Sequence, residues 1–176
     1  MNGVTYPEDF SSYSVGAKYP TLKADNSRTN ASASLSLITQ ARHSIELFSH
    51  NLDPRILDSN EIADAIKQFV KISPRSHLRI LLADPSLAIK QGHCLVELSR
   101  KFSSFISIRK TNEDYQSSVF SFLMVDGKAI VYRPVATDYS AIINYSAQYE
   151  CRQQLEFFNT VWNCSTPLSE IRQLFI

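Results

Sequence analysis

Two short apolar segments, separated by one amphipathic segment, constrain the fold of this chain more than any other feature. Ser44–Ser49 alternates polar and apolar side chains, which predicts a β-strand, and residues 78–83 are a mostly apolar run typical of strands inside parallel sheets. The segment between them carries apolar residues at helical spacing, namely Ile62, Ile66, Phe69 and Val70. A strand, a helix and a second strand in this order predict a right-handed crossover and a parallel strand pair.

The start of that central helix carries the clearest capping signal in the chain. Asp58 is a favourable N-cap, Glu61 follows three residues later as in a capping box, and Leu57 can pack on Ile62 as a hydrophobic staple. Pro74 predicts the end of the helix, because proline disfavours helical backbone in the residue before it.

Further helices and strands continue the alternation. Helices are predicted over residues 30–42, in the segment that contains Leu95, Leu98 and Phe102, and near the C-terminus, followed by a short turn over 169–174. The stripe of the C-terminal helix is Cys151, Leu155, Phe158 and Trp162. Strands are predicted over 105–110, 119–125, 129–133 and 141–146, and Asp126-Gly127 predicts a two-residue hairpin. This order predicts an α/β fold with a mixed, mostly parallel sheet and helices on both faces.

The first 27 residues lack sustained helical or strand periodicity and contain two X-Pro breakers. We therefore expect an irregular arm over residues 1–27 and one α/β domain over 28–176. Four aromatic residues argue against a disordered tail: Tyr6, Phe10, Tyr13 and Tyr19. We expect the arm to pack on the domain or on a neighbouring subunit.

Composition and charge exclude several classes of protein. Lys plus Arg number 18 against 17 for Asp plus Glu, and the net charge of +1 argues against a broad basic surface for duplex nucleic acid. No apolar run approaches the roughly 20 residues of a membrane span, and no secretory signal is visible, so we expect a soluble, cytoplasmic protein. The three cysteines form no C-x-x-C pair, the histidine spacing fits no zinc site and no phosphate-loop motif occurs, so we expect neither a metal nor a cofactor.

The junction M-V-D-G-K before the predicted hairpin carries a resemblance to a known family. Together with the segments A-R-H-S-I-E-L-F-S and H-L-R-I-L-L-A-D, it resembles one half-unit of the phospholipase D superfamily over roughly residues 31–162. The family's signature strand reads H-x-K-x-x-x-x-D. With Asp126 at the aspartate position, Val119 stands at the histidine position and Ser121 at the lysine position. In the family the histidine attacks the phosphodiester and the lysine stabilises charge, so the resemblance implies a phospholipase D-like domain that lacks this activity.

A mixed set of polar residues is predicted at the carboxyl ends of the parallel strands, where open α/β sheets bind ligands. His93 stands at the start of a predicted helix on the same side of the sheet. Arg109 can donate two parallel hydrogen bonds to a phosphate or carboxylate. Asp126 joins the set from the family's aspartate position, although Asp-Gly is also a preferred hairpin pair. The predicted ligand-binding residues are His50, Asp53, Asp84, His93, Arg109 and Asp126.

Several of these residues also have a structural explanation. Asp53 and Asp84 both precede proline and are favourable turn residues, and His50 could cap backbone groups at a strand end. His93 lies away from the apolar stripe of its predicted helix, which places it in solvent or at the rim of the site, where Glu97 could pair with it.

We expect a catalytically inactive domain that acts as a binding module for a phosphate-bearing ligand or nucleic acid. Two alternatives are a protein-interaction or dimerisation scaffold with no ligand site, and an enzyme of different chemistry that uses His50 and His93. Active members of the resembled family place two half-units face to face, and this chain has one, so a homodimer is also expected.

Overall fold

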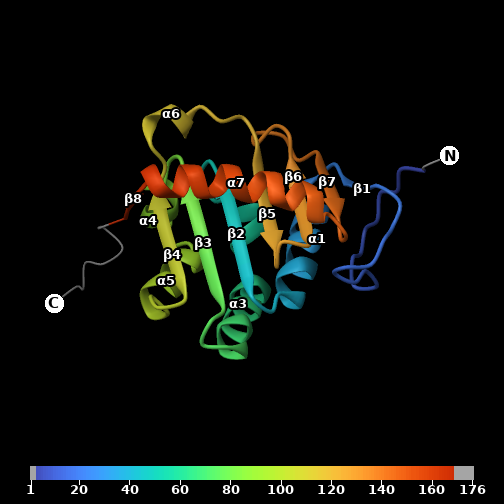
Figure 1. Ribbon diagram of the computed structural model, residues 1–176, viewed down its shortest axis with the longest axis horizontal. Helices are drawn as coiled ribbons and strands as arrows, with labels where there is room; N and C mark the ends of the chain where they lie inside the picture. The colour runs from blue at the N-terminus through green and yellow to red at the C-terminus, as the bar shows by residue number, and fades with distance from the viewer. Residues whose placement is uncertain (1–2, 169–176) are drawn as a thin grey trace.

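A single mixed sheet with helices on both faces organises the chain (Figure 1). The computed structural model describes residues 3–168, and the predicted turn over 169–174 lies outside them. The strand order in this part of the chain is β1-β7-β6-β5-β2-β3-β4-β8. The strands are β1 (Leu22–Ala24), β2 (Ser44–Ser49), β3 (His77–Leu82), β4 (Ile106–Lys110), β5 (Ser121–Val125), β6 (Ala129–Arg133), β7 (Ala141–Asn144) and β8 (Thr166–Pro167).

The α/β class is confirmed, but the expectation of a mostly parallel sheet is wrong. Only β2–β3 and β3–β4 pair in parallel, whereas the other five pairings of the described strands are antiparallel. Parallel neighbours need a long crossover, and the chain has room for one between β2 and β3 and another between β3 and β4. The connections between β5, β6 and β7 are short, so these strands add to the sheet as an antiparallel meander.

Each face of the sheet has its own hydrophobic core, because successive side chains of a strand point to opposite faces. Leu47, Ile80 and Leu123 belong to a core with α1 (Ser27–Gln40), α3 (Asn60–Ile72) and α5 (Cys94–Lys101). Their neighbours Phe48, Leu81 and Phe122 belong to a second core with α7 (Gln148–Cys164), which crosses the front of the sheet in Figure 1. The remaining helices are short, namely α2 (Pro54–Leu57), α4 (Ser86–Gln91) and α6 (Glu113–Gln116). None of the helices within residues 3–168 has the length and hydrophobicity needed to cross a bilayer.

The predicted cap of the central helix is displaced by one residue. The N-cap of α3 is Ser59, whose hydroxyl accepts a hydrogen bond from the Ile62 backbone N–H. Asp58 instead ends α2, and its carboxylate accepts the backbone N–H of Cys94. The two adjacent residues are both good caps, and the short helix α2, which the sequence pattern does not reveal, decides between them.

Part of the N-terminal segment is regular rather than irregular. Strand β1 pairs antiparallel with β7, and Thr5 forms an isolated bridge with Leu22. Phe10 is fully buried in the core beside α1, and the Gln40 side chain holds the segment by accepting the Val15 N–H and donating to the Tyr13 carbonyl. These residues pack on the domain itself.

Asp126 and Gly127 form the predicted hairpin between β5 and β6. Their φ angles are +54° and +60°, as a type I′ turn requires. The carboxylate of Asp126 also reaches across the sheet to the loop before β2, where it accepts three backbone N–H groups, from Arg42 (2.9 Å), His43 (2.7 Å) and Ser44 (2.9 Å). Asp126 therefore fastens the antiparallel half of the sheet to the first parallel strand.

We predict that Asp126→Ala lowers the free energy of unfolding by about 2–4 kcal/mol, because three N–H groups lose a charged acceptor and alanine is strained at positive φ. Urea denaturation followed by circular dichroism measures the change. Asp84→Ala is the matched control, since Asp84 accepts only a local bond from Ser86. Equal losses in the two variants would show that the contact across the sheet contributes little.

Candidate functional site

The predicted ligand-binding residues occupy several separate places in the structure. His50 and Asp84 do lie together at the carboxyl ends of β2 and β3, where the Asp84 backbone N–H donates to the His50 carbonyl at 2.7 Å. Hydrogen bonds from the Ser86 side chain and backbone lower the pKa of Asp84, with smaller contributions from His50 and Lys110. All three side chains are exposed, so this group is an open strand edge.

Arg109 does not join that group. Its guanidinium carbon lies 4.5 Å from the centre of the Trp162 ring, and its Nη1 donates to the Trp162 carbonyl at 2.9 Å. Strand alternation places Arg109 on the face covered by α7. The fork that was expected to bind an anion is therefore used to hold the last turn of α7.

His93 is buried, with 2% of its surface exposed, and the expectation of a solvent or rim position is wrong. The predicted single helix is two helices, because Gly92 ends α4 with a φ of +67° and His93 becomes the N-cap of α5. Its Nδ1 accepts the backbone N–H of Leu95 at 3.1 Å. Glu97 pairs with Arg100 instead of His93.

A group of potential metal ligands surrounds His93, and helix capping explains it. Asp58, His93 and Cys94 place ligand atoms within 4.8 Å of one another. However, Nδ1 of His93 and Oδ1 of Asp58 already accept backbone N–H groups of the first turn of α5. Burial raises the pKa of the Cys94 thiol to about 12, which disfavours the thiolate that a metal would bind.

Asp126 lies at the opposite end of the sheet from His50, because β5 runs antiparallel to β2 and Val125 pairs with Ile45. Its role as a backbone acceptor leaves it outside any site at the carboxyl ends of the strands. Asp53 is the N-cap of α2, as the turn explanation predicts, and it also lines a cavity.

That cavity is a defined site with several polar lining residues. It lies between the carboxyl end of β2, the start of β5, the end of β6 and the helices α1 and α2, and has a volume of about 30 Å³. Six of the lining residues are polar, namely Asn30, Ser34, Ser49, Asp53, Ser121 and Arg133, and the rest of the wall is apolar. Ser121, at the lysine position of the resembled family, is one of the six.

Arg133 is the only cation in this lining, and its direction is fixed by the loop after β6. Its Nε and Nη2 donate to the Asp138 carbonyl at 3.0 and 2.7 Å, and Nη2 also donates to the Ala136 carbonyl. Burial lowers its pKa, and the nearby Asp53 carboxylate opposes this shift. Within the described residues, Nη1 makes no hydrogen bond, so one edge of the guanidinium is unused.

Other polar atoms of the cavity are also unused. Asn30 is fully buried, and its amide nitrogen donates to the Tyr139 carbonyl, but its Oδ1 has no hydrogen-bond partner among the residues that the structure describes. The hydroxyl groups of Ser34 and Ser121 likewise have no partner within residues 3–168. Buried polar atoms are normally paired, so Asn30 Oδ1 calls for a water or ligand partner, and the two serine hydroxyl groups have further hydrogen-bonding capacity beside it.

Sequence reasoning missed Asn30 and Arg133, although one signal points to Arg133. The Asp126-Gly127 hairpin sets the register of β5 and β6, and that register pairs Arg133 with Ser121. A residue opposite the family's lysine position belongs to the same site. No comparable signal identifies Asn30, because a polar residue in a helix usually faces solvent.

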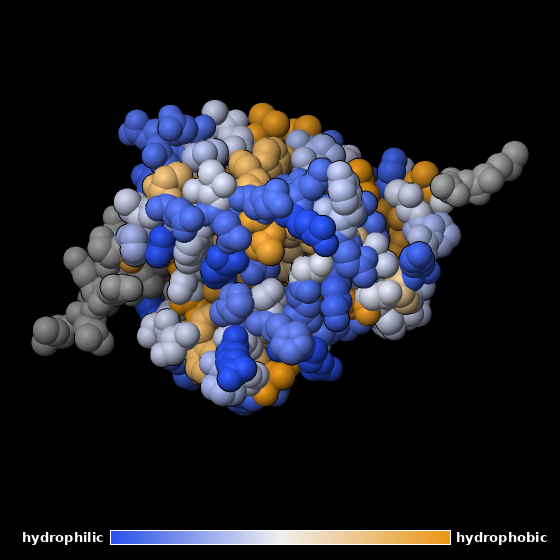
Figure 2. All heavy atoms as spheres, in the orientation of Figure 1, coloured by the Kyte–Doolittle hydropathy of each residue, from blue (hydrophilic) through white to orange (hydrophobic). Residues whose placement is uncertain are grey.

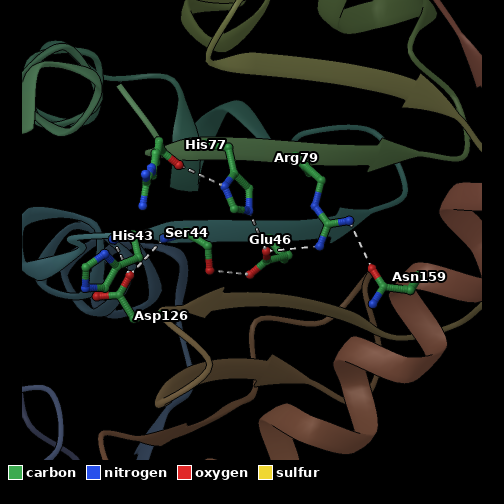
Figure 3. A network of polar contacts seen from close by, with 8 residues as sticks. His43, Ser44, Glu46, His77, Arg79, Asp126 and Asn159 are labelled. Atoms are coloured by element: carbon green, nitrogen blue, oxygen red, sulfur yellow. Dashed lines mark hydrogen bonds and ion pairs between the residues drawn. The ribbon is translucent and has the colours of Figure 1, made fainter. Parts of the chain in front are cut away.

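A second polar network, on the α7 face, joins the sheet to the helix (Figure 3). The buried Glu46 carboxylate lies 3.2 Å from Nη2 of Arg79 and 3.5 Å from Nε2 of His77. Arg79 also donates to the Asn159 side chain of α7 at 2.9 Å and lies over the Phe158 ring. The network compensates a buried charge and attaches α7, so we assign it a structural role.

We predict that His93 makes the protein less stable as the pH falls below about 6.5. Burial lowers the pKa of His93 from its ordinary value of 6.5 in the folded state, so below that value the unfolded chain takes up a proton that the folded chain does not. The free energy of unfolding therefore decreases with falling pH, by at most about 1.4 kcal/mol per pH unit for one group. Urea titrations between pH 5 and 8 measure the slope.

His93→Asn keeps an oxygen that can cap α5 and removes the titration, so its slope should be shallower than that of the wild type. His50→Asn, at an exposed position, is the control and should leave the slope unchanged. A His93→Asn slope equal to the wild-type slope would contradict the assignment.

Solved structures with the same fold have very different sequences. TrmBL2, an archaeal chromatin protein described with a novel mode of DNA binding, matches with a TM-score of 0.63 and 14% identity over 84% of this chain and 53% of its own. This chain therefore spans about half the length of TrmBL2. Nuc from Salmonella typhimurium, a phospholipase D family member, matches with a TM-score of 0.53 and 15% identity over 76% of this chain and 87% of its own. Phosphatidylserine synthase from Haemophilus influenzae matches with a TM-score of 0.61 and 12% identity over 89% of this chain and 41% of its own.

At these identities the likeness establishes the fold alone, which is phospholipase D-like. No curated protein matches the sequence. A family model described as a domain of unknown function, DUF7931, matches residues 26–174. Since this match covers most of the sequence, the chain belongs to the DUF7931 family.

Proposed function

We propose that this chain is a phospholipase D-like domain that binds a ligand without hydrolysing phosphodiesters. The resemblance places the family's nucleophile at Val119 and its charge-stabilising lysine at Ser121. Valine has no lone pair with which to attack phosphorus, and serine carries no positive charge. Val119 is also 67% exposed.

The observation that carries the binding role is the unused hydrogen-bonding capacity around Ser121. Asn30, Ser34, Ser121 and Arg133 all line the same cavity. Within residues 3–168, each of them has a polar atom without a hydrogen-bond partner, and that of Asn30 is buried. This cavity occupies the place where the resembled family carries its lysine. We therefore assign the ligand site to this cavity, in place of the dispersed set that contains His50, His93 and Arg109.

A phosphate-bearing ligand or nucleic acid at the strand edge is a second candidate. His50 and Lys110 both contribute to lowering the pKa of Asp84 there, so this edge of the sheet favours negative charge. TrmBL2, which shares the fold, is described as binding DNA. An enzyme based on His50 and His93 has no support in the geometry, since His93 is buried and caps α5.

We also propose that the domain forms a homodimer through the loops beside the cavity. Val119 and Val135 are 67% and 48% exposed, and each lies two residues beyond the Ser121–Arg133 pair. The Ala136 N–H donates to the Val119 carbonyl, which holds the two loops together. Figure 2 shows apolar residues at the upper rim of the molecule, where these loops lie. A second copy would remove both valine side chains from water.

We predict no phosphodiesterase activity above that of a mock purification, because both the attacking group and the charge stabilisation are missing. Hydrolysis of bis-p-nitrophenyl phosphate and of DNA measures it, with an active phospholipase D family member as the positive control. Hydrolysis by the wild type that is lost in Ser121→Ala, a variant expected to fold normally, would overturn the first part of the proposal.

We predict a particle mass of twice the 19.9 kDa chain mass by light scattering at micromolar concentration, where interfaces of standard size persist. A Val119→Asp, Val135→Asp double variant should be monomeric, because it places charge in the proposed interface. Ile72→Asp, at the exposed end of α3, is the control and should remain dimeric. A monomeric wild type contradicts this proposal and leaves the ligand site unaffected.

A further inference from the structure

We propose that the cavity between β2, β5 and β6 binds the adjacent hydroxyl groups of a neutral sugar or polyol. This inference rests on the proposed binding function and adds the chemical class of the ligand. Its basis is the combination of donors and acceptors that the fold leaves unpaired around one small, partly apolar space.

The unpaired groups are of both kinds. Asn30 Oδ1 can only accept a hydrogen bond, and the direction of its amide is set by the bond from Nδ2 to the Tyr139 carbonyl. Nη1 of Arg133 can only donate, and two carbonyl groups fix its position. The hydroxyl groups of Ser34 and Ser121 can do either. A ligand that satisfies the whole set must itself donate and accept.

An anion fits this set poorly. A carboxylate or a phosphodiester has no hydrogen-bond donor, so it would leave the buried Asn30 oxygen unpaired. Asp53, whose field acts on Arg133, would repel it. The charges of the cavity lining, one Arg and one Asp, cancel, and no second cation remains at position 121.

A cation fits no better, because it would face the guanidinium of Arg133 and could not use its donor. A hydroxyl group satisfies both requirements, since each one donates once and accepts from two directions. Two adjacent hydroxyl groups can therefore bridge Asn30 or Asp53 on one side and Arg133 on the other. The ring or chain that carries them would contact apolar lining side chains such as Ile56 and Leu123.

The size of the cavity agrees with partial entry of such a ligand. Its volume of about 30 Å³ exceeds the roughly 10–15 Å³ that one water molecule needs, so it admits one or two hydroxyl groups. The remainder of a sugar would stay at the mouth. The cavity would then recognise the two hydroxyl groups. The residues around its mouth would contact the rest of the sugar and discriminate among sugars.

The test is a titration of the ¹⁵N-labelled full chain, followed by NMR, with D-ribose, inorganic phosphate and a short single-stranded DNA as separate probes. We expect D-ribose to shift the Asn30 side-chain amide and the Ser121 and Arg133 signals, with a dissociation constant of about millimolar for so small a ligand. Ser121→Ala should weaken this binding up to about tenfold, the effect of one neutral hydrogen bond. Ser107→Ala, on the exposed part of β4, is the matched control and should bind like the wild type.

The outcomes separate the ligand class from the binding function. Phosphate or DNA shifting the cavity signals while D-ribose does not would overturn the diol inference and leave the binding module standing. Shifts confined to His50 and Lys110 with the anionic probes would move the site to the strand edge and also overturn the inference. If none of the three probes shifts the cavity or the strand edge, the cavity holds water alone, and both proposals fail. The Ser121→Lys variant provides a further test in the same titration. A cation at this position should strengthen phosphate binding and weaken D-ribose binding.

Discussion

The junction between β2 and β5 is the constraint on which the rest of this structure depends. Here the parallel part of the sheet meets the antiparallel part, and the Asp126 carboxylate fixes the junction by accepting the N–H groups of Arg42, His43 and Ser44. This contact fixes the pairing register of β2 and β5, and that register determines which of their residues are neighbours at the far end of the two strands. Because Phe122 pairs with Phe48, the start of β5 reaches the carboxyl end of β2, and Ser121 arrives at the cavity.

Much of the fold could be predicted because hydrophobic periodicity and turn chemistry are local properties. The bounds of β2 were predicted from its alternation, and those of β6 follow from the Asp-Gly hairpin. Two other features depend on tertiary contacts and could not be predicted in this way. One is the choice between Asp58 and Ser59 as the cap of α3, and the other is the division of one predicted helix into α4 and α5. The share of parallel pairing depends on which strands become neighbours, and β5 lies beside β2, far away in the sequence.

The candidate site was harder to predict, because position at a strand end does not determine where a side chain points. Adjacent residues of a strand face opposite sides, so Arg109 turns to Trp162 and α7 while Lys110 remains exposed at the edge. Helical spacing predicts that His93 faces solvent or the rim of the site. In the structure His93 precedes α5 as its N-cap, so helical spacing does not apply to it, and its side chain is buried. Neither Arg133 nor Asn30 lies in a motif. The pairing of Ser121 with Arg133 across the hairpin connects Arg133 to the resembled family, whereas no such signal exists for Asn30.

A serine at position 121, where the resembled family carries a lysine, gives the cavity a different chemistry from a lysine there. A lysine there would lie across the hairpin from Arg133, and two cations together could stabilise the charge of a phosphoryl group. With serine, the remaining cation lies near Asp53, and the lining is electrically neutral. A lining with one cation beside a carboxylate stabilises developing negative charge less than two cations would, but it can discriminate ligands by the pattern of their donors and acceptors. The serine that we propose to abolish phosphodiester hydrolysis would therefore also favour recognition of an uncharged, hydroxylated group.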